Sequence, residues 1–158
     1  MNIPSHKRAQ QLDQIMKITG SALWAWDIAS GEMHFDPLFF TMAGYTTDEF
    51  PHQIEEWMKR IHPEDRERVM ALANNHLKGL VDSLDVEFRF RRKDHTYMWI
   101  RSRGEIVERE ESGKPLKMIG RHSDITERKQ VQENLEAESP LCFHLYRVSL
   151  NLTQAKSF

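Results

Sequence analysis

The spacing of apolar residues changes along the chain from mainly helical to that of strands. Leu12, Ile15 and Met16 recur three and four positions apart, a spacing that predicts a helix. Val86 and Phe88 alternate with charged residues, as in a half-buried strand. In chain order the patterns predict a helix at 6–19, strands at 23–28 and 32–35, a helix beginning at Pro37, helices at 54–61 and 63–78, and strands at 86–91, 97–107 and 116–125.

Short-range signals place the ends of the long helix. Pro63 suits a first helical position, and Lys78-Gly79 marks the end. We expect this helix to bury the apolar residues that share one face: Val69, Leu72, Ala73 and Leu80. The three strands that follow are consecutive and joined by short turns, such as Lys93-Asp94-His95. The fold class is therefore predicted as α+β, with one antiparallel sheet and helices over one face.

Composition removes several classes of function. The 158 residues carry a net charge of −2 and are 39% hydrophobic, which is typical of a soluble globular domain with no basic surface for nucleic acid. The sequence has no apolar run of membrane-spanning length and no signal peptide, so we expect a cytoplasmic protein. Gly-rich phosphate loops and nucleophile motifs are absent, and no histidines stand four apart to bind zinc. We therefore expect neither catalytic residues nor a metal site in this fragment.

Five short motifs occur in the order in which they occur in a known family. They are Trp24-x-Trp26-Asp27, Met42-Ala43-Gly44-Tyr45, Ile61-His62-Pro63-Glu64-Asp65-Arg66, Glu87-Phe88-Arg89-Phe90-Arg91 followed by Trp99-Ile100-Arg101, and Ile119-Gly120-Arg121-His122-Ser123-Asp124-Ile125-Thr126-Glu127-Arg128-Lys129. Together they resemble the PAS/PAC sensory box. The resemblance covers roughly residues 21–129. It implies a five-stranded antiparallel sheet, helices that enclose a small pocket, and flanking helices at both ends.

The domain organisation follows from this resemblance and from changes in pattern. The predicted segments are an N-terminal helical linker at 1–20, the PAS/PAC domain at 21–126, a coiled-coil-like exit helix at 127–139, and a tail of uncertain origin at 140–158. Val131 and Leu135 lie four apart on the exit helix, a thin apolar seam. We expect the tail either to extend helically against a partner chain or to be disordered.

The resemblance implies a sensory input domain without catalytic activity. Such domains sense a small ligand, redox state or a partner, and pass the signal to a histidine kinase or diguanylate cyclase output domain in the same chain. We expect a homodimer through the flanking helices. Two alternatives stay open: a ligand-free dimerisation or protein-interaction module, and a sensor that binds haem or flavin.

Cofactor chemistry is restricted by the single cysteine. Cys142 lies outside the PAS-like region, which excludes the flavin–cysteine bond and the covalent coumaroyl chromophore of similar domains. Haem would need an axial ligand, and His76 on the long helix is the candidate because haem-binding PAS domains use a histidine there. A hydrogen-bonded histidine near the helix end is the simpler interpretation. We expect no cofactor, with haem or non-covalent flavin as alternatives.

Two groups of residues are predicted to carry the function. The candidate ligand pocket is formed by Trp26, Phe39, Met58, Leu72, His76, Phe88, Ile100, Met118 and His122. The candidate relay is formed by Asp124, Thr126, Arg101 and Arg103. In similar domains the aspartate pairs with a basic residue on a neighbouring strand, and Thr126 stands where a hydroxyl can cap the exit helix. We expect Asp124 to accept hydrogen bonds from Arg101 or Arg103, or from backbone near Thr126.

Overall fold

The computed structural model describes residues 5–138. The chain divides into two units, Met1–Ile125 and Thr126–Phe158. In the second unit residues 126–138 form a helix, on which Val131 and Leu135 are exposed. The predicted tail at 140–158 lies outside the described residues. No helix within 5–138 is long and apolar enough to cross a membrane.

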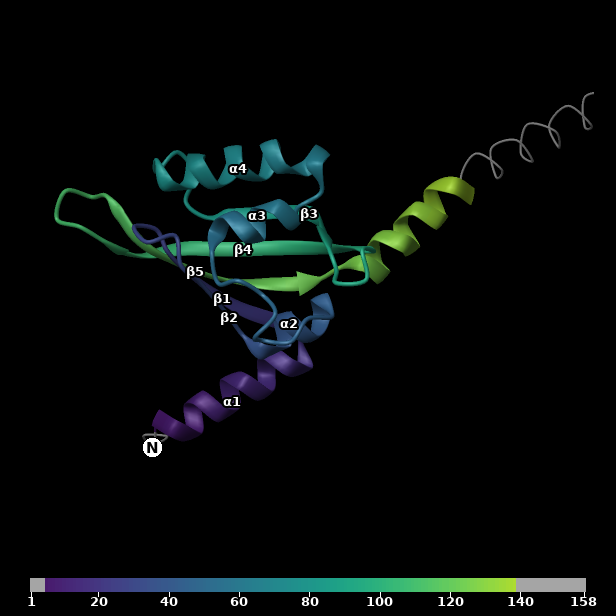
Figure 1. Ribbon diagram of the computed structural model, residues 1–158, viewed down its shortest axis with the longest axis horizontal. Coiled ribbons are helices and arrows are strands. Elements are labelled where there is room, and N and C mark those ends of the chain that lie inside the picture. Colours follow the sequence, from purple (N-terminus) through teal and green to yellow (C-terminus); the bar gives the residue numbers. More distant parts are fainter. Residues whose placement is uncertain (1–4, 139–158) are drawn as a thin grey trace, which may run out of the picture. The chain divides into compact units, whose positions relative to one another are not determined.

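The first unit is an α+β domain around one antiparallel sheet, which confirms the predicted fold class (Figure 1). The strands are ordered β2-β1-β5-β4-β3 across the sheet. The elements are α1 (Ser5–Ile18), β1 (Ser21–Asp27), β2 (Met33–Phe35), α2 (Pro37–Ala43), α3 (Ile54–Arg60), α4 (Pro63–Leu77), β3 (Leu84–Arg91), β4 (Tyr97–Arg109) and β5 (Pro115–Asp124).

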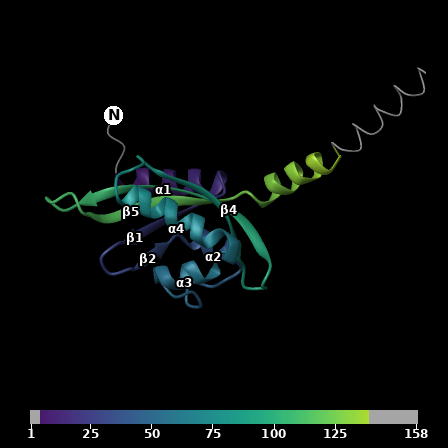
Figure 2. The same ribbon diagram turned by 90° about the horizontal axis from the view of Figure 1, so that it is seen from above.

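Helices α3 and α4 cover one face of the sheet, which we call the inner face (Figures 1 and 2). On β1, β3, β4 and β5 the even-numbered residues point to this face, because side chains alternate along a strand. On β2 the inner residues are Met33 and Phe35, the partners of Trp26 and Trp24. The inner positions of β3 are buried throughout, from Leu84 to Phe90. The odd-numbered positions of β1, β3, β4 and β5 form the outer face and include Arg101, Arg103 and the exposed Ile119.

Helix α4 ends at Leu77, within one residue of the predicted end at Lys78-Gly79. His62 accepts a hydrogen bond from the Glu64 N–H at its start, and Gly79, with φ +74°, stops it after Leu77. The expectation that Leu80 is buried is therefore wrong: its side chain is 69% exposed. Helical spacing cannot be extrapolated past a residue that leaves the helical conformation.

One inner-face row shows why two sheet positions have no side chain. Trp24, Gly120, Gly104 and Leu84 are consecutive cross-strand neighbours on β1, β5, β4 and β3. The indole of Trp24 lies against both glycines. A Cβ atom at Gly104 would stand 2.6 Å from Cη2 of Trp24, and one at Gly120 would overlap both the ring and the carbonyl oxygen of Arg103. The row therefore needs glycine at both positions.

This packing predicts different costs at the two glycines. Gly104→Ala should lower the free energy of unfolding by about 2 kcal/mol, and Gly120→Ala by about 3 kcal/mol or more, because overpacking there also involves backbone. Trp24→Phe removes the indole atoms that Gly104→Ala would contact. In that background Gly104→Ala should cost clearly less, whereas Gly120→Ala should cost nearly as much as before. Urea unfolding of the three single and two double variants tests this, and equal relief at both positions would contradict it.

Candidate functional site

A small cavity lies between the inner face and helices α3 and α4. Its volume is about 40 Å³. Every strand of the sheet contributes to its wall. The lining residues are Trp24, Trp26, Met33, Ile54, Trp57, Val69, Met70, Ala73, Leu84, Val86, Ser102, Met118 and His122. None of these described residues is a lysine, arginine, aspartate or glutamate, so the wall is apolar apart from a hydroxyl, an imidazole and three indoles.

His122 on β5 stands at the centre of an aromatic cluster. Its ring is nearly parallel to that of Trp57, with centroids 5.7 Å apart, and is stacked on Trp24 at 5.6 Å. Phe39 from α2 contacts it at 5.2 Å. Its cross-strand neighbour on the inner face is Ser102. The side chain is thus enclosed by aromatic rings from two helices, α2 and α3, and from the sheet.

Burial makes His122 a neutral histidine. Its side chain is 1% exposed. Because burial disfavours the charged form, the pKa of His122 falls from 6.5 to about 3. The imidazole is therefore uncharged at physiological pH and contributes one donor and one acceptor nitrogen.

Four buried nitrogen atoms around this cavity have no hydrogen-bond partner among the described residues. They are Nε1 of Trp24, Trp26 and Trp57, and Nδ1 of His122. Buried polar groups normally find partners, and each exception needs an explanation. Here all four residues line the same cavity. These side chains therefore offer unpaired polar atoms to a guest that supplies acceptor atoms.

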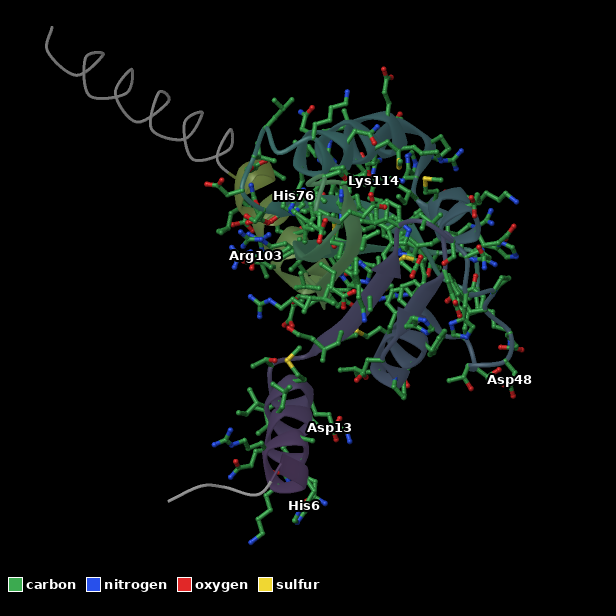
Figure 3. The ribbon with its side chains drawn as sticks, turned by 90° about the vertical axis from the view of Figure 1, so that its left-hand side faces the viewer. His6, Asp13, Asp48, His76, Arg103 and Lys114 are labelled. Atoms are coloured by element: carbon green, nitrogen blue, oxygen red, sulfur yellow. The ribbon has the colours of Figure 1, made fainter. Side chains whose placement is uncertain are left out.

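The predicted pocket residues separate into two groups. Trp26, Met118 and His122 line the cavity. Phe39, Phe88 and Ile100 are fully buried in the surrounding core, and Met58 and Leu72 pack partly buried against it. His76 is buried at the end of α4, where Nδ1 lies 2.9 Å from the carbonyl oxygen of Val81 (Figure 3). That contact joins the helix end to the next turn and does not belong to the cavity wall.

Asp124 has a different arginine partner from the two expected. Nη2 of Arg92 donates to Oδ2 of Asp124 over 3.2 Å. Arg101 and Arg103 instead donate to Asp85. Alternation explains the correction: Asp124 is opposite Ile100 on the inner face, whereas the two arginines of β4 point outward. Arg92 follows β3 in the position that continues its inner-face series.

A second ion pair fixes α4 to the sheet. Asp65, in the first turn of α4, accepts 2.9 Å hydrogen bonds from the backbone N–H and from Nε of Arg89 on β3. Burial alone would raise the pKa of Asp65, but the Arg89 hydrogen bonds hold that pKa below its ordinary value. This ion pair therefore holds α4, which lines one side of the cavity, in a fixed position over β3.

A larger hollow of about 740 Å³ lies on the outer face beside α1. Met16 of α1 and the exposed sheet residues Leu23, Val107 and Ile119 line it. Arg103, labelled on β4 in Figure 3, stands at this surface. The hollow is open and mostly apolar, so it resembles a contact surface more than a closed ligand site.

Comparison with known proteins places these features in a family. Residues 32–122, more than half of the chain, match the sequence profile of the PAS fold. The chain is 24% identical over 155 residues to a blue-light-activated histidine kinase of Brucella ovis, covering 98% of this chain but only 30% of the kinase. The chain thus spans about a third of the length of the curated relatives that it first matches.

Solved structures give the same assignment. A sensory box histidine kinase/response regulator from Burkholderia thailandensis is 31% identical with a TM-score of 0.73, covering 85% of this chain and 98% of that one. The N-terminal domain of a diguanylate cyclase with a PAS/PAC sensor from Marinobacter aquaeolei is 24% identical with a TM-score of 0.62, covering 69% and 98%. The second likeness supports the fold alone.

The buried imidazole predicts a specific pH dependence. The unfolded chain takes up a proton at His122 near pH 6.5, but the folded chain does so only near pH 3. Stability is therefore lost as pH falls through this window, by about 2 kcal/mol between pH 6.5 and about pH 5. Urea unfolding at both pH values should show this loss, and His122→Gln should remove it. His6→Gln, on the exposed face of α1, is the matched control; an unchanged pH slope in His122→Gln would contradict the assignment.

Proposed function

The chain belongs to the PAS fold family, and from that premise we propose that it is a sensory input domain. Its role is to bind a small molecule in the inner-face cavity and to relay occupancy to an output domain of a longer parent protein. Histidine kinases and diguanylate cyclases among its relatives make either activity the proposed output. A cytoplasmic location is part of the same proposal.

The observation that carries this proposal is the position of β5. Met118 and His122 of this strand line the cavity, and Asp124 follows on the same face at the strand's end. β5 pairs with both β1 and β4, so it lies in the middle of the sheet. A guest that displaces His122 would therefore act on the strand that leads directly into the 126–138 segment.

Flavin and haem do not fit the cavity. Sites for ligands of drug size are commonly about 300–1,000 Å³, and this cavity is about 40 Å³. His76, the candidate haem ligand, does not line it. The blue-light activation in the name of the Brucella kinase is therefore not transferred to this chain. The proposed sensor works without either group.

We further propose that the chain functions as a homodimer through its flanking helices. On α1 the apolar residues Leu12, Ile15 and Ile18 are 52–85% exposed. Val131 and Leu135 form a similar exposed seam on the 126–138 helix. A helix with an uncovered apolar stripe is stabilised by packing against a second helix. A second copy of the chain supplies matching stripes.

Light scattering during size-exclusion chromatography tests the dimer. The unmodified chain should elute as a dimer at about 0.1 mM, a concentration that allows micromolar association. Ile15→Glu should shift it toward monomer, because a charge would then be buried in the contact. Gln10→Glu adds the same acid on the opposite side of α1, about 140° around the helix from Ile15, and should leave the dimer intact. A monomeric unmodified chain, or equal effects of both substitutions, would count against this interface.

The relay is tested at Asp124. The Arg92–Asp124 pair is partly exposed, with both side chains near 30%, so Asp124→Ala should cost the isolated domain about 1 kcal/mol or less. In the full-length parent it should change kinase or cyclase output several-fold, because a similar free energy shifts a two-state equilibrium by that factor.

Asp85→Ala is the matched control for this experiment. It breaks the pairs with Arg101 and Arg103 on the outer face at a similar exposure, away from the end of β5. Parent output should stay unchanged in this variant. Thermal melting of the isolated domain verifies that both variants fold. Unchanged output in a folded Asp124→Ala parent would reduce Asp124 to a structural role.

A further inference from the structure

We propose, resting on the sensory function above, that the cavity binds a compact, uncharged molecule with hydrogen-bond acceptor atoms. The indole N–H groups of Trp24, Trp26 and Trp57 donate to it. Small amides, ketones and related carbonyl compounds form this class. Membership of the family does not determine which ligand is bound, so the ligand class is inferred from the residues that line the cavity.

The demand for acceptors comes from the indoles. An indole N–H can only donate a hydrogen bond, so it needs an acceptor atom and cannot pair with a neighbouring N–H group. Trp24 and Trp57 are 5% and 7% exposed, and their Nε1 atoms have no partner among the described residues. Donors buried in this way are normally paired. Since three of them border one small space, a single guest with one or two acceptor atoms would serve them together.

The absence of charge from the lining residues selects an uncharged guest. No lysine or arginine of the described chain borders the cavity, and His122 is enclosed by aromatic rings rather than by an acid that would stabilise its cation. A carboxylate or phosphate would be taken out of water without a counter-charge, which is strongly unfavourable. A cation would face three N–H donors. The lining residues therefore favour an uncharged molecule over an anion or a cation.

Size limits the guest to a few non-hydrogen atoms. About 40 Å³ is room for roughly three water-sized spheres. Met33, Met70 and Met118 border the space, and methionine side chains adapt readily to a guest. A four-atom amide such as acetamide therefore matches the cavity with small side-chain movements, whereas a two-ring molecule does not.

Acetamide is the probe, and the four indole N–H signals in a ¹H–¹⁵N NMR spectrum are the readout. Saturable shifts are expected for Trp24, Trp26 and Trp57, downfield for the two whose N–H groups donate to the two lone pairs of the single carbonyl oxygen. Half-saturation is expected in the millimolar range, which suits so small a ligand. Trp99 is the internal control. It lies on β4 with an odd, outer-face position and beneath Arg89, and its signal should not move. Single Trp→Phe variants assign the signals.

Xenon provides the matched apolar probe, because it enters small apolar cavities without accepting hydrogen bonds. Trp57→Phe removes one donor and enlarges the space. It should weaken acetamide binding about tenfold, the effect of one buried hydrogen bond, while xenon binding stays equal or strengthens. Trp99→Phe should change neither. The titration of the unmodified chain does not depend on whether any variant folds.

Three outcomes would overturn the proposal. The first is the absence of saturable indole shifts up to about 0.2 M acetamide. The second is equal weakening of acetamide and xenon by Trp57→Phe. The third is water that stays bound at the indoles and is not displaced by acetamide, which would make the cavity a hydration site only.

Failure of the ligand class and failure of the sensory function give different results. Acetamide binding in the domain, with no response of parent output to acetamide or to Asp124→Ala, would refute the sensory function and leave the ligand class standing. Output that changes in Asp124→Ala, with no indole shifts in the domain, would refute the ligand class alone.

Discussion

The indole of Trp24 lies across Gly120 and Gly104, and this close approach determines how the inner face is filled. A side chain at either glycine would meet the ring or the backbone. Because neither glycine carries a side chain, the indole lies close to the sheet, where it stacks on His122. Trp57 of α3 then covers His122 from the helical side. The cavity is the space that remains between rings whose shapes do not interlock completely.

Alternation along the strands made the sheet predictable, and the same rule could have corrected the relay. Two-residue periodicity located all three strands of the second half within two residues of their ends. Applied across β4 and β5, it also places Asp124 and Arg101 on opposite faces, because Ile100 is the partner of Asp124. Motif order predicted Arg101 or Arg103 without that geometric check, and this part of the prediction is wrong. Donation to Asp124 from backbone near Thr126, the alternative, stays a prediction. Arg92 was the basic residue with the correct parity.

The cavity itself could not be predicted from the sequence. Spacing indicated which side chains point inward, and Trp26, Met118 and His122 do line the space. Whether a space remains depends on how rings from α3, β1 and β5 pack, and this is set by tertiary contacts rather than by local pattern. The unpaired indole nitrogens are equally invisible in sequence, since a tryptophan on an apolar face usually finds a partner or reaches water.

The position of β5 joins the cavity to the end of the domain in one physical argument. Met118, His122 and Asp124 lie on the same face of this strand, and its register with β1 and β4 is continuous from Ser123 to Met118. Close-packed interiors do not absorb a guest without displacement. A displacement at His122 can be relieved toward β1 or β4 only by disturbing those ladders. The strain is relieved most easily at the end of β5, where both ladders stop and Asp124 forms a partly exposed ion pair with Arg92. A sensor of the proposed kind needs a weak interaction at the end of a well-paired strand. The binding of a small ligand can supply enough free energy to break an ion pair of about 1 kcal/mol, but not a ladder of backbone hydrogen bonds.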